Sequence, residues 1–249
     1  MNNNSIIFKI IKKYIDELSF KLSTVAKDSI GFEDSLTTIT NLVGEEPHDF
    51  FKGEKGALKN FGNPTILFND LKKSTDLIKE LEDKNILYYY SYYMYYSSKM
   101  LSEILDAFDA KIVECTGDGH YSILQNMDNL VADKIKREYS YFCEFLCETE
   151  KFENYLNAFD HKENSFIDNR SHLLDVDKII RKLFFYIFAY FNIEINKLLP
   201  KGMSKKFLMR VGCATGECQI MRIENSHIRQ DKLIGSVVHK SAHQASGKI

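Results

Sequence analysis

Hydrophobic and polar residues follow two different periods along the chain, and these periods separate helical segments from strand-forming ones. From residue 5 to about residue 26, apolar side chains recur every three or four positions, which predicts an amphipathic helix. The same spacing predicts helical regions over residues 75–110, 128–159 and 175–199, the last of them strongly apolar. Pro200 and Gly202 end this last segment, as expected after a helix.

Short apolar runs between turn residues predict strands. One begins at Ile66, two residues after Pro64, and two more cover residues 111–115 and 120–124 around an Asp-Gly turn, which is a strong hairpin signal. A further pair is expected over residues 207–213 and 217–223.

The segments between these elements are expected to be irregular. Residues 27–63 show no period and contain several turn-forming glycines, which predicts a linker or loop into the first strand. Residues 160–171 are polar and predict a loop, and residues 225–232 predict a polar connection to a last helix over residues 237–246.

Two aspartates fall at the ends of predicted strands. Asp70 follows the run at Ile66 and leads into a turn, with Ser74 or Thr75 expected to cap the next helix, and Asp118 occupies the hairpin turn. Two carboxylates about 4 Å apart repel by roughly 4 kcal/mol at a dielectric constant of about 20. A divalent cation would turn this cost into binding energy, and Mg²⁺ prefers one or two carboxylates with water and phosphate. The plainer interpretation is a helix cap and a turn residue.

Composition places bounds on the class of protein. The chain has 249 residues, a net charge of -2 and 44% hydrophobic residues, which suits one globular domain with an attachment. The near-neutral charge argues against dedicated nucleic-acid binding. No apolar run approaches the roughly 18 residues that a membrane span needs, and the N-terminus lacks a secretory pattern, so a cytoplasmic location is the default expectation. Five cysteines without a regular framework suggest reduced thiols, with Cys143 and Cys147 in core packing rather than in a zinc site.

Two apolar segments leave more than one role open. The helix over residues 5–26 can pack on its own domain, serve dimerisation or regulation, or lie on a membrane surface. The second segment holds seven tyrosines between Tyr88 and Tyr96 and could suggest base stacking. A helix distributes consecutive residues around its circumference, so core and subunit-interface packing is the better interpretation.

Several motifs, taken in order, resemble the catalytic domain of class III nucleotide cyclases. They are ILFNDLKKST, ECTGDGHYSIL, MRVGCATGECQI and LIGSVVHKSAHQA. The resemblance covers residues 63–249, with residues 125–206 containing a helical insertion that is longer than the family pattern, and residues 1–62 forming an N-terminal helix and linker. It implies an α+β fold with a ferredoxin-like core, in which a mostly antiparallel sheet has flanking helices. A palm-type polymerase, which also uses two aspartates on a similar sheet, is a distant alternative.

The resemblance implies a two-metal site. Asp70 and Asp118 would hold two Mg²⁺ or Mn²⁺ ions per active site, assisted by the backbone carbonyl of Leu71. The turn that follows would bind the β- and γ-phosphates of a nucleoside triphosphate through backbone N–H groups at a helix N-terminus, unless it is only a solvated turn. The residues of this turn are Lys72, Lys73, Ser74 and Thr75.

The positions that read the base and assist the reaction depart from the purine-cyclase pattern. Glu114 stands where lysine goes with adenine and glutamate with guanine, and Lys232, beside Asp231, stands where aspartate or cysteine is usual. His239 and His243 replace an asparagine that orients the ribose and an arginine that stabilises the transition state. The two histidines share a helix face, where they could donate to phosphate, or suggest zinc.

These departures resemble the bacterial pyrimidine cyclases of the Pycsar antiphage system, which make cyclic UMP or cyclic CMP. The resemblance implies a homodimer with shared active sites, a UTP or CTP substrate with UTP favoured, and a separate effector that reads the cyclic product. It implies no nucleic-acid or membrane partner. A guanylate or adenylate cyclase and a non-catalytic pseudo-cyclase that binds a nucleotide or a partner are the alternatives.

Overall fold

The computed structural model describes residues 5–28, 50, 58–125, 129–146, 149–159, 175–224 and 229–247. The helices are α1 (Ile6–Asp28), α3 (Ser74–Asp83), α4 (Tyr88–Asp106), α5 (Asn129–Leu146), α6 (Glu150–Leu156), α8 (Val176–Ile195) and α9 (Ser236–Ala245). The strands are β1 (Leu58–Asn60), β2 (Thr65–Leu71), β3 (Ala110–Cys115), β4 (Gly119–Leu124), β5 (Met209–Thr215), β6 (Gln219–Glu224) and β7 (Arg229–Ile234). The predicted helical region over residues 75–110 is therefore two helices, α3 and α4.

The central sheet has four strands in the order β3-β4-β2-β5, and every neighbouring pair is antiparallel. Helices α3 and α4 connect β2 to β3, and the insertion helices connect β4 to β5, so the elements follow a β-α-β-β-α-β plan. This connectivity and strand order define the ferredoxin-like fold. The predicted α+β class with an antiparallel sheet and flanking helices is confirmed.

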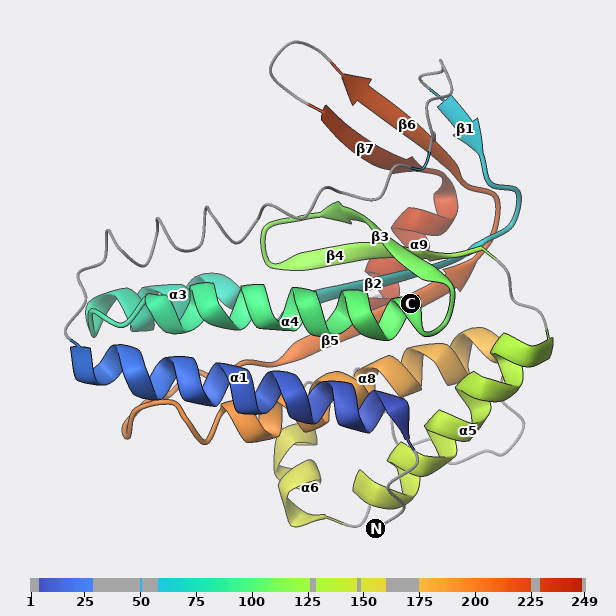
Figure 1. The fold of residues 1–249 in the computed structure, drawn as a ribbon. Helices are drawn as coiled ribbons and strands as arrows, with labels where there is room; N and C mark the ends of the chain where they lie inside the picture. Colours follow the sequence, from blue (N-terminus) through green and yellow to red (C-terminus); the bar gives the residue numbers. More distant parts are fainter. Residues whose placement is uncertain are drawn as a thin grey trace.

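A second sheet of three strands, β1-β6-β7, rises from one side of the central sheet (Figure 1). Two of its strands lie where irregular structure was expected. Residues 58–60 of the predicted linker form β1, which pairs with β6, and the predicted polar connection over residues 225–232 contains the first residues of β7. The rest of the predicted linker, apart from residue 50, lies outside the described residues.

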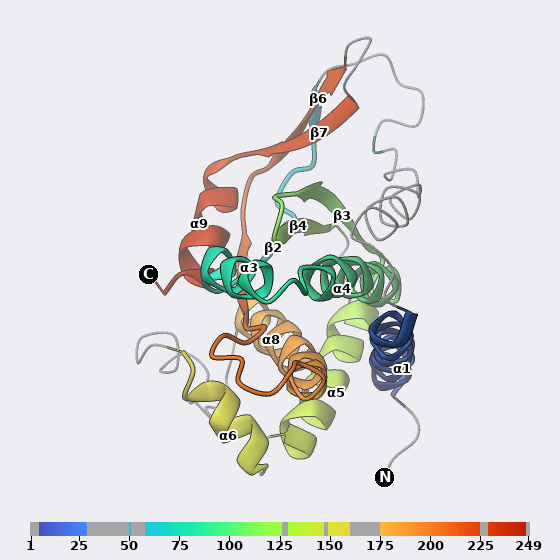
Figure 2. The same ribbon diagram turned by 90° about the vertical axis from the view of Figure 1, so that its left-hand side faces the viewer.

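The two faces of the central sheet have different coverings (Figure 2). Leu67 and Leu71 of β2 point to the large core that the sheet shares with α1, α4, α5, α6 and α8. Ile66, one residue along, points to a smaller core beneath α9, where Val237 and Val238 pack. Successive side chains of a strand alternate between faces, so β2 is apolar on both sides and is buried in the middle of the sheet.

The N-terminal helix packs on its own chain. Its apolar stripe contacts α4 and α8, and Lys13 and Tyr14 both donate to the Glu103 carboxylate on α4 at 2.8 Å. Burial and the Glu103 charge raise the pKa of Tyr14 to about 12, so the phenol stays protonated and donates. Of the roles left open for this helix, packing on its own domain is the one that the structure shows.

The tyrosine-rich helix α4 is also a core element. Tyr89, Tyr92, Tyr93 and Tyr96 are buried, and the Tyr93 ring stacks on Phe207 with centroids 3.9 Å apart. The preference for packing over base stacking is therefore confirmed for these four rings.

The insertion forms helices that cover the sheet. α8 is buried on most of its circumference and packs against α5, α6 and β5. None of the helices in the described ranges combines the length and the apolar character of a membrane span. The described cysteines, among them Cys143, are free thiols, while Cys147 and the predicted loop over residues 160–171 lie outside the described residues.

Candidate functional site

The structure brings the two predicted metal aspartates to the same end of neighbouring strands. Asp70, near the end of β2, lies opposite Gly119 of β4, and the N–H of Leu71 donates to the carbonyl of Asp118 at 3.2 Å. A side chain at Gly119 would place its Cβ 2.9 Å from the Cβ of Asp70, so glycine leaves room beside the carboxylate. Asp70, Leu71 and Asp118 are thus juxtaposed as expected, and their role as metal ligands stays a prediction.

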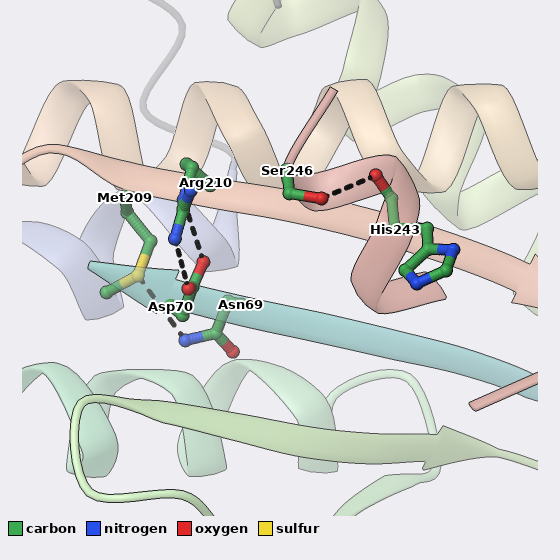
Figure 3. Close-up of polar contacts among 6 residues, drawn as sticks. All are labelled: Asn69, Asp70, Met209, Arg210, His243 and Ser246. Carbon is green, nitrogen blue, oxygen red and sulfur yellow. Dashed lines mark hydrogen bonds and ion pairs between the residues drawn. The ribbon is translucent and has the colours of Figure 1, made fainter. Parts of the chain in front are cut away.

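Arg210 is a site residue that the sequence pattern did not single out. It lies opposite Asp70 on β5, and its guanidinium binds both oxygens of the Asp70 carboxylate, with Nε 3.1 Å from Oδ1 and Nη2 2.5 Å from Oδ2 (Figure 3). The Asp70 side chain is 17% exposed and that of Arg210 24% exposed, so the pair is partly shielded from water. The sequence signal for this residue was a charged side chain within the predicted strand over residues 207–213.

The donor set around Asp70 suits a hard divalent cation. In the described part of the chain no group of three or more His, Cys, Asp or Glu residues could hold a metal ion. Two carboxylates are nevertheless what Mg²⁺ takes from a protein when phosphate and water complete its coordination. The residues therefore fit Mg²⁺ or Mn²⁺, on the condition that Asp70 exchanges at least one contact with Arg210 for the cation.

The turn between β2 and α3 differs in detail from the expectation. The predicted cap at Ser74 or Thr75 is wrong, because the cap residue is Lys73, which adopts a left-handed conformation with φ 55° and makes no side-chain capping bond. The N–H groups of Asp76 and Leu77 donate to its carbonyl. Without a capping side chain, the first N–H groups of α3 are left open to an anion such as phosphate.

Lys72 points away from this turn. Its side chain is buried, and its Nζ lies 5.1 Å from the centre of the Phe159 ring, which follows α6 in the insertion. Its backbone N–H donates to the carbonyl of Leu208 at 2.8 Å. The burial of this side chain does not match the solvated-turn alternative, and the Lys72 N–H that was predicted to bind phosphate is already bonded to Leu208. The Lys73 side chain is exposed.

The two predicted base-reading residues meet within one chain. Lys232 of β7 donates to Oε1 of Glu114 on β3 at 2.7 Å. Glu114 lies opposite Tyr121, which lies opposite Phe68, and the two rings pack with centroids 4.4 Å apart. Residues opposite one another in a sheet share a face, so Glu114 lies on the Asp70 face, two strands away from it. Burial, followed by the charges of Glu114 and Asp70, raises the pKa of Tyr121.

Asp231 is placed differently from Lys232. It forms a bidentate pair with Arg222 across the β6–β7 hairpin, at 2.9 and 3.0 Å, and both side chains are 10% exposed. Consecutive residues of a strand point to opposite faces, so Asp231 and Lys232 cannot both reach Glu114. The Asp231 carboxylate is engaged by Arg222 in the hairpin, and its part in base reading stays a prediction.

His239 and His243 lie one turn apart on the exposed side of α9. Their predicted common helix face is therefore present. Among the described residues, neither imidazole contacts Asp70 or Asp118, and Figure 3 shows the His243 ring apart from the Asp70–Arg210 pair. One chain alone does not bring the histidines and the aspartates together.

A buried polar cluster lies on the opposite face of the sheet, directly beneath the site. Asn69 Nδ2 is 3.2 Å from His120 Nδ1, and His120 Nε2 is 2.8 Å from Ser98 Oγ, which donates to the carbonyl of Met94 at 2.7 Å. This arrangement suits a neutral imidazole protonated at Nε2, which donates to Ser98 and accepts from Asn69. Asn69 also donates to the sulfur of Met209, the residue before Arg210 (Figure 3). The sequence pattern gave no indication of this cluster.

Comparison with known proteins gives only distant similarity. No family model matches the chain, and a search of curated proteins finds no match. Among solved structures, a class III adenylyl cyclase-like ATP-binding protein from Pseudomonas aeruginosa has a TM-score of 0.42 and 13% identity over 76% of this chain. The guanylyl cyclase Cya2 has a TM-score of 0.40 and 16% identity, covering 77% of this chain and 71% of its own.

The adenylyl cyclase CyaB from P. aeruginosa gives a TM-score of 0.40 and 15% identity over 76% of this chain and 73% of its own. The chain spans only 32% of the length of the ATP-binding protein from P. aeruginosa.

The buried His120 predicts a specific loss of stability in acid. Burial lowers the pKa of His120 from 6.5 to about 4, so the unfolded chain takes up a proton between these values while the folded chain does not. The contribution of the neutral ring to the free energy of unfolding is fully present above pH 6.5. It is lost as the pH falls towards 4, by about 3 kcal/mol in total. The test is chemical denaturation of the wild type and His120→Gln across this pH range. The free energy of unfolding of the wild type should fall by about 3 kcal/mol more than that of the variant.

His243→Gln, which removes an exposed histidine, should follow the wild-type curve. Equal pH dependence of the wild type and His120→Gln would show that His120 titrates normally in the folded chain.

Proposed function

We propose that this chain is a nucleotide cyclase that converts a pyrimidine nucleoside triphosphate, UTP in preference to CTP, into its 3′,5′-cyclic monophosphate and pyrophosphate. The observation that carries the proposal is the arrangement at the end of the central sheet where the β3–β4 hairpin turns. Asp70 and Asp118 lie together at strand ends, and a Glu114–Lys232 pair lies two strands away. Carboxylates for a cation and a hydrogen-bonding pair for a base are what such a reaction requires.

The reaction joins the ribose O3′ to the α-phosphorus and breaks the bond from that phosphorus to the oxygen bridging the β-phosphate, with loss of the hydroxyl proton. Asp70 and Asp118, with the Leu71 carbonyl, would hold two Mg²⁺ or Mn²⁺ ions, which activate the hydroxyl and neutralise the phosphates when bound. The open N–H groups at the start of α3, together with Lys73, bind the β- and γ-phosphates. The chain thus contributes position and charge rather than a covalent intermediate.

The choice of base follows from which residue of the Glu114–Lys232 pair is negative and which is positive. In the pattern that goes with adenine, lysine occupies the position of Glu114 and aspartate that of Lys232, so the two charges are reversed here. Glu114 accepts from a ring N–H and Lys232 donates to the adjacent carbonyl, and uracil offers both at N3 and O4. In the free protein the two side chains satisfy one another at 2.7 Å, and the base replaces both contacts together.

Guanine is the second candidate, because its N1–H and O6 present the same edge and Glu114 is the residue that goes with guanine. Cytosine and adenine present an amino group beside a ring nitrogen. The amino group donates a hydrogen bond at the place where uracil and guanine have a carbonyl, so it would need an acceptor in place of Lys232. The Glu114–Lys232 pair is therefore expected to favour UTP and GTP over CTP and ATP as substrates.

A dimer completes the site in this proposal. His239 and His243 do not meet the aspartates of their own chain, and each supplies an imidazole to the site of a second copy. The three-stranded sheet offers a surface for that contact, because Leu58, Ile223 and Ile234 are 54%, 39% and 40% exposed on the face that also carries Lys232. The cyclic product serves as a second messenger for a separate effector in antiphage defence.

The first test is product formation by the purified chain with Mn²⁺ and each of ATP, GTP, CTP and UTP separately, with products identified by mass. Cyclic UMP should be the main product, and Asp118→Ala should lower its formation by at least about 10³-fold, since one side of the metal site is lost. Asp133→Ala, on the exposed side of α5, is the matched control and should retain full activity. No cyclic product from any nucleotide, or product formation by Asp118→Ala at the wild-type rate, would remove the proposal.

The second test reverses the reading pair. Glu114→Lys combined with Lys232→Glu keeps an ion pair at this place but exchanges donor and acceptor, so preference should move from UTP towards CTP. A mismatched hydrogen bond to a charged group costs about 1.5–3 kcal/mol, which predicts at least a tenfold change in the ratio of kcat/KM for the two substrates. An unchanged ratio with retained activity would show that the pair does not read the base.

A further inference from the structure

The outer edge of β5 is bonded by side chains instead of by another strand. β2 occupies one edge of β5, and no strand of the described residues pairs with the other. Every second residue of the segment from 207 to 215 makes a backbone hydrogen bond to a side chain on that edge. The bonds join Phe207 to Asn196, Met209 to Tyr155, Val211 to Arg181, Cys213 to Gln244 and Thr215 to Asp177. The insertion helices and α9 therefore close the sheet at β5.

Arg181 differs from the other bonding residues because it joins two elements. Its Nε donates to the carbonyl of Val211 on β5 at 2.7 Å, and its Nη2 donates to the carbonyl of Gln244 on α9. The Gln244 side chain in turn accepts the N–H of Cys213 at 3.1 Å. Arg181, Gln244 and β5 form a closed ring of hydrogen bonds, and the positive charge lies at the carbonyl end of α9, where the helix dipole favours it.

The contact between α9 and β5 is close, so small shifts of the helix are restricted. A Cβ at Gly212, between the two bonded strand residues, would lie 1.7 Å from the carbonyl oxygen of Ser241. The α9 backbone thus rests directly on β5 at this point. With the glycine setting the distance between the helix and the strand, the bonds of Arg181 and Gln244 set where along β5 the helix lies.

We propose that Arg181, a residue of the helical insertion, is a positioning residue that fixes α9 on the sheet and with it the place of His243. His243 directly precedes Gln244, whose backbone and side chain are both held in the ring. The functional part of this inference rests on the proposed cyclase reaction, in which His243 acts in the site of a second copy. The insertion then has a defined role, because it holds the helix that carries the imidazoles at a set position relative to Asp70.

The test combines hydrogen–deuterium exchange of α9 with steady-state kinetics. Arg181→Met should raise the exchange rate of α9 amides at least tenfold while the α1 amides exchange as in wild type. It should lower kcat at least tenfold with little change in KM, because the substrate still binds but the imidazole is displaced. Arg181→Lys, which can bind one of the two carbonyls, should recover part of both effects. Lys178→Met removes a positive charge from the exposed face of the same helix and should match the wild type.

Gln244→Ala opens the same ring without altering α8, and it decides the question if Arg181→Met does not fold. It should loosen α9 selectively, to a smaller degree. Wild-type exchange in α9 of both variants, or equal increases throughout the chain, would overturn the positioning role. If the wild type makes no cyclic nucleotide, the proposed reaction fails, but the exchange experiment still tests the clamp on α9.

Discussion

The contact on which the site depends is the bidentate pair between Asp70 and Arg210, in the middle of the antiparallel sheet. Strand register places a guanidinium on one side of the Asp70 carboxylate and a glycine on the other, with Asp118 at the adjoining turn. Two carboxylates that approach to about 4 Å repel one another by roughly 4 kcal/mol at a dielectric constant of about 20. Arg210 offsets that charge in the free protein, and a divalent cation must take over part of its role.

The sheet separates two environments that serve different purposes. On one face, large aromatic side chains and the Asn69–His120 cluster pack the strands against the helices, and their burial keeps the His120 ring neutral. On the other face, the same strands present Asp70, Tyr121 and Glu114. Because neighbouring residues of one strand point to opposite faces, Asp70 lies between two residues of β2, Asn69 and Leu71, that are buried on the other face.

The sequence allowed much of the framework to be predicted. Short apolar runs between turns located β2, β3 and β4, and apolar residues at helical spacing located the helices. The strand-end positions of Asp70 and Asp118 brought these two residues close together, as the structure shows. The β7 strand was missed because it is mostly polar, and Asp231 and Lys232 each find an opposite charge, from Arg222 and Glu114, that only the folded hairpin supplies. Propensity and periodicity contain no information on such long-range pairs.

The remaining errors have the same cause. A solvated turn was the alternative for Lys72, yet its side chain is buried with Nζ above the ring of Phe159, a residue of the insertion. Arg210 was not singled out within its predicted strand, because its partner Asp70 is 140 positions away in the sequence. The role of the insertion was hidden because its contacts to β5 come from single polar residues such as Arg181, which an apolar helix pattern does not reveal.

The most direct test of the central claim is a titration with Mn²⁺, followed by electron paramagnetic resonance, of the wild type, Asp118→Asn and Arg210→Gln without nucleotide. If Asp70 and Asp118 share a cation against the competition of Arg210, affinity should fall at least tenfold in Asp118→Asn and rise in Arg210→Gln. Equal affinity in the wild type and Asp118→Asn, or weaker binding in Arg210→Gln, would contradict the account.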